Sequence, residues 1–253
     1  MEIENLDIQG GIRFTSTGPG GSIVTGNLTV QLTPNSYSGT GSIWQSTTSN
    51  SDADFYYSLS NDMTTKGLPV DNYFNTNEMT SSSGVNNFDS NATYTIELWF
   101  QPVSGNVILS KWAPQSIAGT QFREPYYFSW GGNSVLIRAS NDGSYIPLEQ
   151  PSVTATNVKP NKWVQVVGVF DWQTEKLYAY TNGILTDQNN QLSVQGQVQT
   201  STAPVRIGAP NTRVTPTLPG LTGTIGIIRM YNKALSAAEV FQNFQANRLV
   251  YGI

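Results

Sequence analysis

The sequence contains no cysteine and no histidine, and only 12% of its 253 residues are charged. Without cysteine there are no disulfides and no thiolate metal sites. Without histidine the usual general base and the usual zinc ligand are missing, and serine–histidine and cysteine–histidine catalysis are excluded. The net charge is −4 and no run of lysine or arginine occurs, so we expect no nucleic acid partner.

Long apolar segments are also missing. No apolar run approaches the roughly 18 residues that span a bilayer, so we expect no membrane insertion. The chain begins with the acidic stretch MEIENLDIQGG, which lacks the apolar core of a signal peptide, so we expect no signal peptide. Much of the remaining sequence is Ser, Thr, Asn, Gln and Gly, a polar but uncharged composition typical of extracellular β modules and virion proteins.

Strand patterns are frequent and are separated by turn residues, which predicts an antiparallel β-sandwich. Residues 94–102 alternate with a period of two, and residues 163–171 have apolar side chains on both faces, as a central strand would. The dipeptide Asn182-Gly183 is a strong signal for a two-residue hairpin turn. We expect strands or hairpins at 94–102, 106–112, 126–140, 163–171, 175–188, 203–210 and 223–231.

The two ends of the chain differ from this pattern. Ser236 and Glu239 form a capping-box motif, which predicts a short C-terminal helix of about three turns. The N-terminal residues are rich in Gly, Ser and Thr, and we predict an extended docking arm over residues 1–30 followed by one β domain over 31–253. An ordinary ragged terminus is the alternative for the arm.

Several motifs in this order resemble the laminin-G-like, concanavalin-A-like jelly-roll domains. They are SYSGTGSIW (36–44), YTIELWFQP (94–102), KWVQVVGVFDWQTEKLYAYTNG (162–183), RIG (206–208) and GTIGIIRMYNKALSAAEVFQNF (223–244). The resemblance covers roughly residues 28–248. It implies an all-β fold, an antiparallel two-sheet β-sandwich of the jelly-roll type. It also implies that the C-terminal helix packs over an end of the sandwich and buries Tyr231, Leu235, Val240 and Phe244.

Some relatives with this fold are glucanases, which place paired carboxylates on one strand to protonate the leaving oxygen and to attack or stabilise the sugar. Glu97 stands alone on its strand and is followed by Leu98, Trp99 and Phe100. We therefore expect no enzymatic activity, and we expect Glu97 to face outward or to pair with a nearby arginine. Arg229 is expected to form a structural ion pair. A glycoside hydrolase remains the weakest alternative.

Many members of the family bind calcium through carboxylates near the start of the domain and in the last strand. Here Gly226 and Ile227 replace the acidic pair of the last strand. Asp71 is the remaining candidate ligand for Ca²⁺, an ion that prefers oxygen ligands. The alternative is that Asp71 is an ordinary turn residue. No other cofactor is expected.

A neutral glycan is usually held by a flat aromatic ring with amide and carboxylate groups beside it. We expect residues 110–132 to form a long irregular segment, and loops carry function more often than strands do. The alternative is that the aromatic residues pack in the core. The candidate ligand-binding residues are Trp112, Arg123, Glu124, Tyr126 and Tyr127 in this segment and Trp172 in a separate turn.

The motifs SYSGTGSIW and LSAAEVFQNF, together with the glycine-rich IQGGIRF, resemble laminin-G-like domains of tailed phages, cyanophages among them. This resemblance implies a non-enzymatic virion structural protein, such as a capsid decoration protein, head fibre or tail-associated protein. The arm would bind other virion proteins, and the location would be the virion. A carbohydrate-binding adhesin that recognises host surface glycan is the alternative. Open sandwich edges favour self-association into a homo-oligomer.

Overall fold

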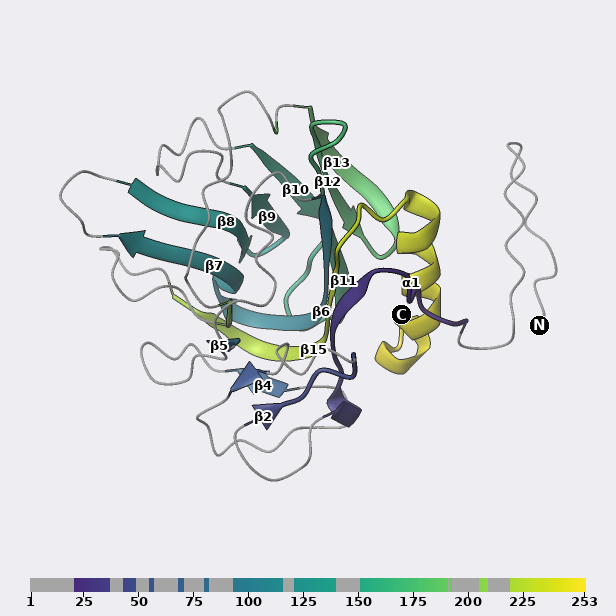
Figure 1. The fold of residues 1–253 in the computed structure, drawn as a ribbon. Coiled ribbons are helices and arrows are strands. Elements are labelled where there is room, and N and C mark those ends of the chain that lie inside the picture. The colour runs from purple at the N-terminus through teal and green to yellow at the C-terminus, as the bar shows by residue number, and fades with distance from the viewer. Residues whose placement is uncertain are drawn as a thin grey trace.

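A computed structural model of the protein describes residues 21–36, 43–48, 55–56, 68–70, 80–81, 93–115, 121–139, 151–190, 192, 205–208 and 219–253. Within these ranges, two antiparallel sheets of seven and five strands pack face to face (Figure 1). A small three-stranded sheet and one α-helix are also present. The all-β sandwich with a C-terminal helix that the sequence predicts is therefore confirmed.

The elements follow one another along the chain with the strands far outnumbering the helical segments. They are β1 (Leu28–Leu32), η1 (Pro34–Ser36), β2 (Ile43–Trp44), β3 (Phe55–Tyr56), β4 (Leu68–Val70), β5 (Thr80–Ser81), β6 (Tyr94–Gly105), β7 (Val107–Gln115), β8 (Gln121–Trp130), β9 (Ser134–Arg138), β10 (Ser152–Thr156), β11 (Val164–Asp171), β12 (Lys176–Thr181), β13 (Ile184–Asn189), β14 (Arg206–Ile207), β15 (Leu221–Tyr231) and α1 (Ala237–Tyr251).

Strand order defines the two main layers. The seven-stranded sheet has the order β1-β15-β6-β11-β12-β13, with β4 also paired to β15, and the five-stranded sheet has the order β10-β9-β8-β7-β14. The third sheet has the order β2-β3-β5. Strand β11 lies between β6 and β12, which confirms the central position predicted from its two apolar faces.

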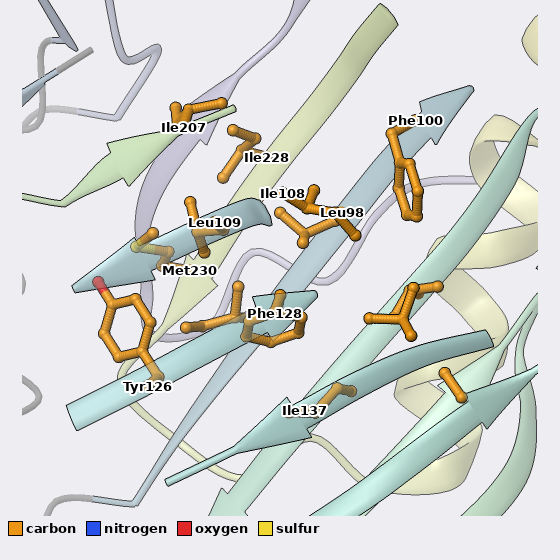
Figure 2. Close-up of a cluster of buried hydrophobic side chains, with 14 of the residues drawn as sticks. Leu98, Phe100, Ile108, Leu109, Tyr126, Phe128, Ile137, Ile207, Ile228 and Met230 are labelled. Carbon is orange, nitrogen blue, oxygen red and sulfur yellow. The ribbon is translucent and has the colours of Figure 1, made fainter. Parts of the chain in front are cut away.

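The hydrophobic core fills the space between the two sheets (Figure 2). Strand β6 contributes Leu98 and Phe100, and the five-stranded sheet contributes Phe128 and Ile137. Burial of one such side chain stabilises the fold by roughly 1.5–3 kcal/mol. Gly168 on β11 leaves the space that the facing side chains need, because a Cβ atom there would lie 2.8 Å from Cζ of Phe128.

Helix α1 covers the outer face of the seven-stranded sheet, on the side away from β7 to β10 (Figure 1). The expected packing over an end of the sandwich is therefore wrong. The reason is that the outer face of this sheet is itself apolar, with Trp99, Val167 and Ile227 buried there. The helix is also longer than expected, with 15 residues. None of the described helical segments is long and apolar enough to cross a membrane.

Both ends of α1 are capped. The hydroxyl of Ser236 accepts a hydrogen bond from the backbone N–H of Glu239 at 3.3 Å, and the Glu239 carboxylate accepts one from the Ser236 backbone N–H at 2.9 Å. These bonds confirm the predicted capping box and satisfy two of the free N–H groups at the helix start. Gly252 ends the helix in the left-handed conformation, with a φ of 75°.

Four residues near or on the helix were expected to be buried. Tyr231, Leu235 and Val240 are buried as expected. Phe244 is only partly buried, and its ring stacks on Trp99 with a centroid separation of 6.0 Å. Partial exposure arises because the helix lies on an open sheet face, where its flanks remain in solvent.

The residues just before β1 are held against the helix. The backbone N–H of Val24 donates to the Asn243 side chain at 2.8 Å, and the Gln242 side chain donates to the Ser22 carbonyl at 2.8 Å. Strand β1 then pairs with β15 and fully buries Val30 and Leu32. Residues 28–30 of the predicted arm therefore lie in the sheet, while residues 1–20 lie outside the described residues.

At one edge strand of each main sheet, backbone groups are hydrogen-bonded to neighbouring residues outside the strand ladder. The Asp187 carboxylate accepts from the Thr154 backbone N–H at 2.8 Å, and the Thr186 hydroxyl donates to the Thr154 carbonyl at 3.3 Å, so β13 closes the edge of β10. On β1, the Gln31 N–H and carbonyl are bonded to Ser46 and Thr47. These positions offer no free backbone groups for strand addition by a second copy. Self-association stays a prediction without support from these edges.

Candidate functional site

A buried polar cluster lies between the outer face of the seven-stranded sheet and α1. Its centre is the fully buried carboxylate of Glu97 on β6. One oxygen accepts from Trp99 Nε1 at 2.8 Å, from Gln165 Nε2 at 2.9 Å and from Arg229 Nη1 at 3.1 Å. The other oxygen accepts from Asn243 Nδ2 at 2.8 Å. Four donors therefore surround one carboxylate in a region closed to solvent.

The position of Glu97 decides what chemistry it can perform. The expectation that it faces outward is wrong, because the helix covers that face of the sheet, but the expected pairing with an arginine is confirmed. Glu97 is fully buried and protein donors occupy both of its carboxylate oxygens, so the group is not accessible to a sugar. The ion pair expected for Arg229 is confirmed, and the cluster is structural.

The same cluster joins distant parts of the chain. Arg229 also donates to Gln31 on β1 at 3.1 Å and to Asn247 on α1 at 2.9 Å. The Tyr231 hydroxyl accepts from Asn243 at 2.8 Å and donates to the Val24 carbonyl at 3.2 Å. Burial, followed by the nearby Glu97 charge, raises the pKa of the Tyr231 hydroxyl. The cluster therefore fixes both the N-terminal segment and the helix on the sheet.

Two buried tyrosines at the interface between α1 and the sheet differ in the hydrogen bonding of their hydroxyl groups, so their replacement by phenylalanine can be compared. The Tyr231 hydroxyl has two hydrogen-bond partners, whereas the buried Tyr251 hydroxyl has none. We expect Tyr231→Phe to lower the free energy of unfolding by about 1–2 kcal/mol, because it leaves polar partners unsatisfied. Tyr251→Phe is expected to be neutral or stabilising by up to about 1 kcal/mol, because it removes an unsatisfied group. Urea denaturation measures both, and equal destabilisation would contradict this account.

Most of the segment predicted to be long and irregular is a strand pair. Strand β7 extends to Gln115 and β8 starts at Gln121. The expectation of an irregular segment over 110–132 is therefore wrong. Apolar and polar residues do not alternate regularly in β7 and β8, but the two strands still pair, and the pairing contains two register shifts. Trp112 lies in β7, and Arg123 and Glu124 lie in β8. Their side chains lie outside the described part of the structure.

Tyr126 and Tyr127 lie on opposite faces of β8. Tyr126 is fully buried in the core, with its ring centroid 6.0 Å from that of Tyr94. Tyr127 faces away from the core, where its hydroxyl donates to Asn106 at 3.0 Å and the guanidinium of Arg138 lies 5.3 Å from its ring centroid. Both rings are buried, so neither offers an exposed platform for a sugar.

Trp172 occupies a tight turn between β11 and β12. The Asp171 carboxylate accepts hydrogen bonds from the backbone N–H groups of Gln173 and Thr174 at 3.1 and 3.3 Å and from the Thr174 hydroxyl at 2.6 Å. These bonds fix the turn on both sides of Trp172, as an Asx turn does. The Trp172 side chain is partly buried against the core. Sequence analysis missed Asp171, although an Asp followed three residues later by Thr is a local turn signal.

Strand register brings several candidate residues to one end of the sandwich. Strand β11 ends at Asp171, beside the start of β6 at Tyr94. The Tyr94 ring lies against the Tyr126 ring across the core, and Tyr126 on β8 pairs with Lys111 on β7.

The backbone of Trp112 and of Arg123 and Glu124 therefore lies toward the same end of the sandwich as the Trp172 turn. This end is the candidate ligand-binding region, with Trp172 as its described aromatic side chain.

The candidate calcium ligand Asp71 lies outside the described residues, so it stays a prediction. Within the described ranges, no group of three or more acidic side chains is arranged to hold a metal ion. The structure explains the glycine that replaces a family acid in the last strand. A Cβ atom at Gly226 would lie 2.4 Å from the Tyr251 hydroxyl, so the packing of α1 leaves no room for a side chain there.

The fold defines a lectin-like β-sandwich, and the buried polar cluster around Glu97 holds α1 on its outer face. A laminin G family model, described as the concanavalin A-like lectin/glucanases superfamily, matches residues 71–241. Because the match covers more than half of the chain, the chain belongs to the concanavalin A-like lectin/glucanases superfamily. The resemblance to this family in the sequence motifs is thereby confirmed. No curated protein matches the chain by sequence.

Solved structures with a similar fold include binding domains of bacterial toxins. The receptor binding domain of botulinum neurotoxin D is similar with a TM-score of 0.63 and 9% identity, over 88% of this chain and 53% of that chain. The botulinum neurotoxin serotype G binding domain gives 0.57 and 15%, over 86% and 50%. The binding domain of Paraclostridial Mosquitocidal Protein 1 gives 0.53 and 12%, over 86% and 52%. The chain thus spans about half the length of these toxin domains, and the likeness is one of fold.

Proposed function

We propose that the chain is a non-enzymatic, carbohydrate-binding module of the lectin type. The observation that carries this proposal is the turn of Trp172, which Asp171 fixes at the end of the sandwich where β7 ends and β8 begins. A rigidly held tryptophan suits a sugar ring, because an apolar ring face can stack on it at little entropic cost. The buried, fully bonded state of Glu97 supports a binding role over hydrolysis.

The test is binding of surface polysaccharides to the protein displayed in many copies on a bead, with Trp172→Ala as the variant. We expect Trp172→Ala to weaken glycan binding by about tenfold or more, the effect of removing a tryptophan at the centre of an interface. Glycan arrays identify the ligand, and titration measures the affinity.

Trp163→Ala is the matched control for this substitution. Trp163 is also partly buried, but it packs on Tyr251 at the helix face with a centroid separation of 4.4 Å. We expect its replacement to leave glycan affinity within about threefold of the parent, since it lies away from the candidate region. The absence of any bound glycan, or an equal loss with both variants, would contradict the proposal.

We further propose that the module is a structural protein of a tailed-phage virion, located on the particle and attached through its N-terminal residues. The motifs described above support this context. The course of residues 22–24 also supports it, because their contacts with α1 place the start of the described chain on the outer face of the sandwich. A chain lacking residues 1–20 should bind glycan normally but should be lost from purified particles. Unchanged incorporation would reject attachment through this segment.

A further inference from the structure

The turn between β12 and β13 is held by one residue of the neighbouring strand β11. The Asn182 backbone N–H donates to the Gln165 carbonyl at 2.9 Å, and the Gln165 backbone N–H donates to the Asn182 side-chain oxygen at 2.9 Å. The Gly183 backbone N–H donates to the Gln165 side-chain oxygen at 3.0 Å. Gln165 therefore makes three hydrogen bonds to the dipeptide Asn182-Gly183.

The fold leaves little choice of residues at this turn. Both positions have positive φ angles, 50° at Asn182 and 77° at Gly183, which is the two-residue hairpin turn that Asn-Gly favours. A Cβ atom at position 183 would lie 2.9 Å from Cδ2 of Phe241 and 3.1 Å from Cβ of Phe244. Packing of α1 against the hairpin therefore requires glycine after Asn182.

Asn-Gly is also the dipeptide in which asparagine is chemically least stable, because glycine does not hinder attack by its own backbone nitrogen. In that reaction the Gly183 nitrogen loses its proton and forms a bond to Cγ of Asn182. The bond from Cγ to the side-chain nitrogen breaks, and that nitrogen leaves as ammonia after gaining the proton. Water then opens the resulting five-membered imide to aspartate or isoaspartate. The net change is gain of one water and loss of one ammonia.

We infer that Asn182 is a deamidation site that Gln165 keeps unreactive. The attacking nitrogen must lose the proton that it donates to Oε1 of Gln165, and the side chain under attack is held by the backbone N–H of the same residue. Reaction therefore requires the turn to open first, so the rate follows the population of the open turn.

Gln165 is itself held in place from the opposite side. Its Nε2 donates to Glu97 at 2.9 Å, which fixes Oε1 toward Gly183. Gln165 is fully buried between the hairpin and the polar cluster under α1. The protection of Asn182 therefore depends on the contact between Gln165 and Glu97 within this cluster.

The test compares deamidation of Asn182 in the intact protein with that in a peptide of residues 178–186, YAYTNGILT, at mildly alkaline pH. Peptide mapping by mass spectrometry measures both rates. We expect the protein to react at least about tenfold more slowly than the peptide. Gln165→Met is expected to speed the reaction in the protein by about fivefold, because it removes the hydrogen bond from Gly183 to the Gln165 side chain and keeps the backbone bond to Asn182.

Asn247→Ala is the matched control for Gln165→Met. It removes a different hydrogen bond of the same cluster, the one from Arg229, and leaves all the bonds to Asn182 and Gly183 in place. We expect it to change the deamidation rate by less than about threefold. Deamidation of the parent protein at the peptide rate would overturn the inference, even if Gln165→Met fails to fold. An equal acceleration by both variants would overturn it as well.

Discussion

Glu97→Gln is expected to lower the free energy of unfolding by about 3–5 kcal/mol, the cost of leaving one member of a buried ion pair without its partner. Arg229 would remain almost fully buried beside a neutral amide, and Trp99 and Asn243 would face a weaker acceptor. The predicted loss is a large share of the stability of an ordinary domain. Urea denaturation followed by tryptophan fluorescence measures it.

Glu239→Gln provides the same substitution in a different setting. Glu239 pairs with Lys233 near the start of α1, where both side chains are partly exposed. Partial burial would by itself raise the pKa of the Glu239 carboxyl, but the hydrogen bonds from Lys233 and Ser236 together lower it below its ordinary value. Its loss is expected to cost at most about 1 kcal/mol, as for other partly exposed pairs.

A double variant separates the charge from the packing at Glu97. Arg229→Met combined with Glu97→Gln removes the unpaired buried charge, so we expect the double variant to be more stable than Glu97→Gln alone. A cost of 1 kcal/mol or less for Glu97→Gln would show that the cluster does not hold the helix on the sheet in the way that its contacts indicate.

Removal of residues 1–30 is expected to destabilise the domain by more than about 4 kcal/mol, because it deletes two buried valines and most of an edge strand. Val30 is fully buried, and Val24 bonds to Asn243 on α1. A chain that begins at residue 21 keeps these contacts and is expected to be as stable as the full chain within about 1 kcal/mol. Chemical denaturation and limited proteolysis compare the two truncations.

The same two truncations locate the end of the docking arm. Equal stability of both would contradict the assignment of residues 21–30 to the sandwich and would support an arm that ends at residue 30. The predicted difference matters for the proposed virion role, because only the shorter deletion can test attachment to a particle without damaging the fold.

Local patterns were enough to predict most of the described strands and the partners within two hairpins. The alternation in 163–171 predicted a central strand, and Asn182-Gly183 predicted the hairpin that β12 and β13 form. The capping box at Ser236 and Glu239 predicted where α1 begins. Each of these signals depends on neighbours within a few residues, and their physical causes, side-chain alternation, positive φ angles and free N–H groups, act over the same short range.

The candidate site was harder to predict. The sequence left a ligand-binding role and packing in the core open for Tyr126 and Tyr127, and the structure shows that both rings are buried. The short spacing between Asp171 and Thr174 was a detectable signal for the fixed turn of Trp172. The contact between Glu97 and Asn243 gave no such signal, because the two residues are 146 positions apart.

The sequence by itself determined the β-sandwich, the hairpins, the capped helix and the absence of cysteine and histidine chemistry. Only the tertiary structure decided that α1 covers a sheet face, that Glu97 is buried under it and that Gly226 must lack a side chain. The physical reason is that these features arise where elements distant in the chain exclude water together. The free energy of such burial depends on every group brought to the interface, which no local pattern records.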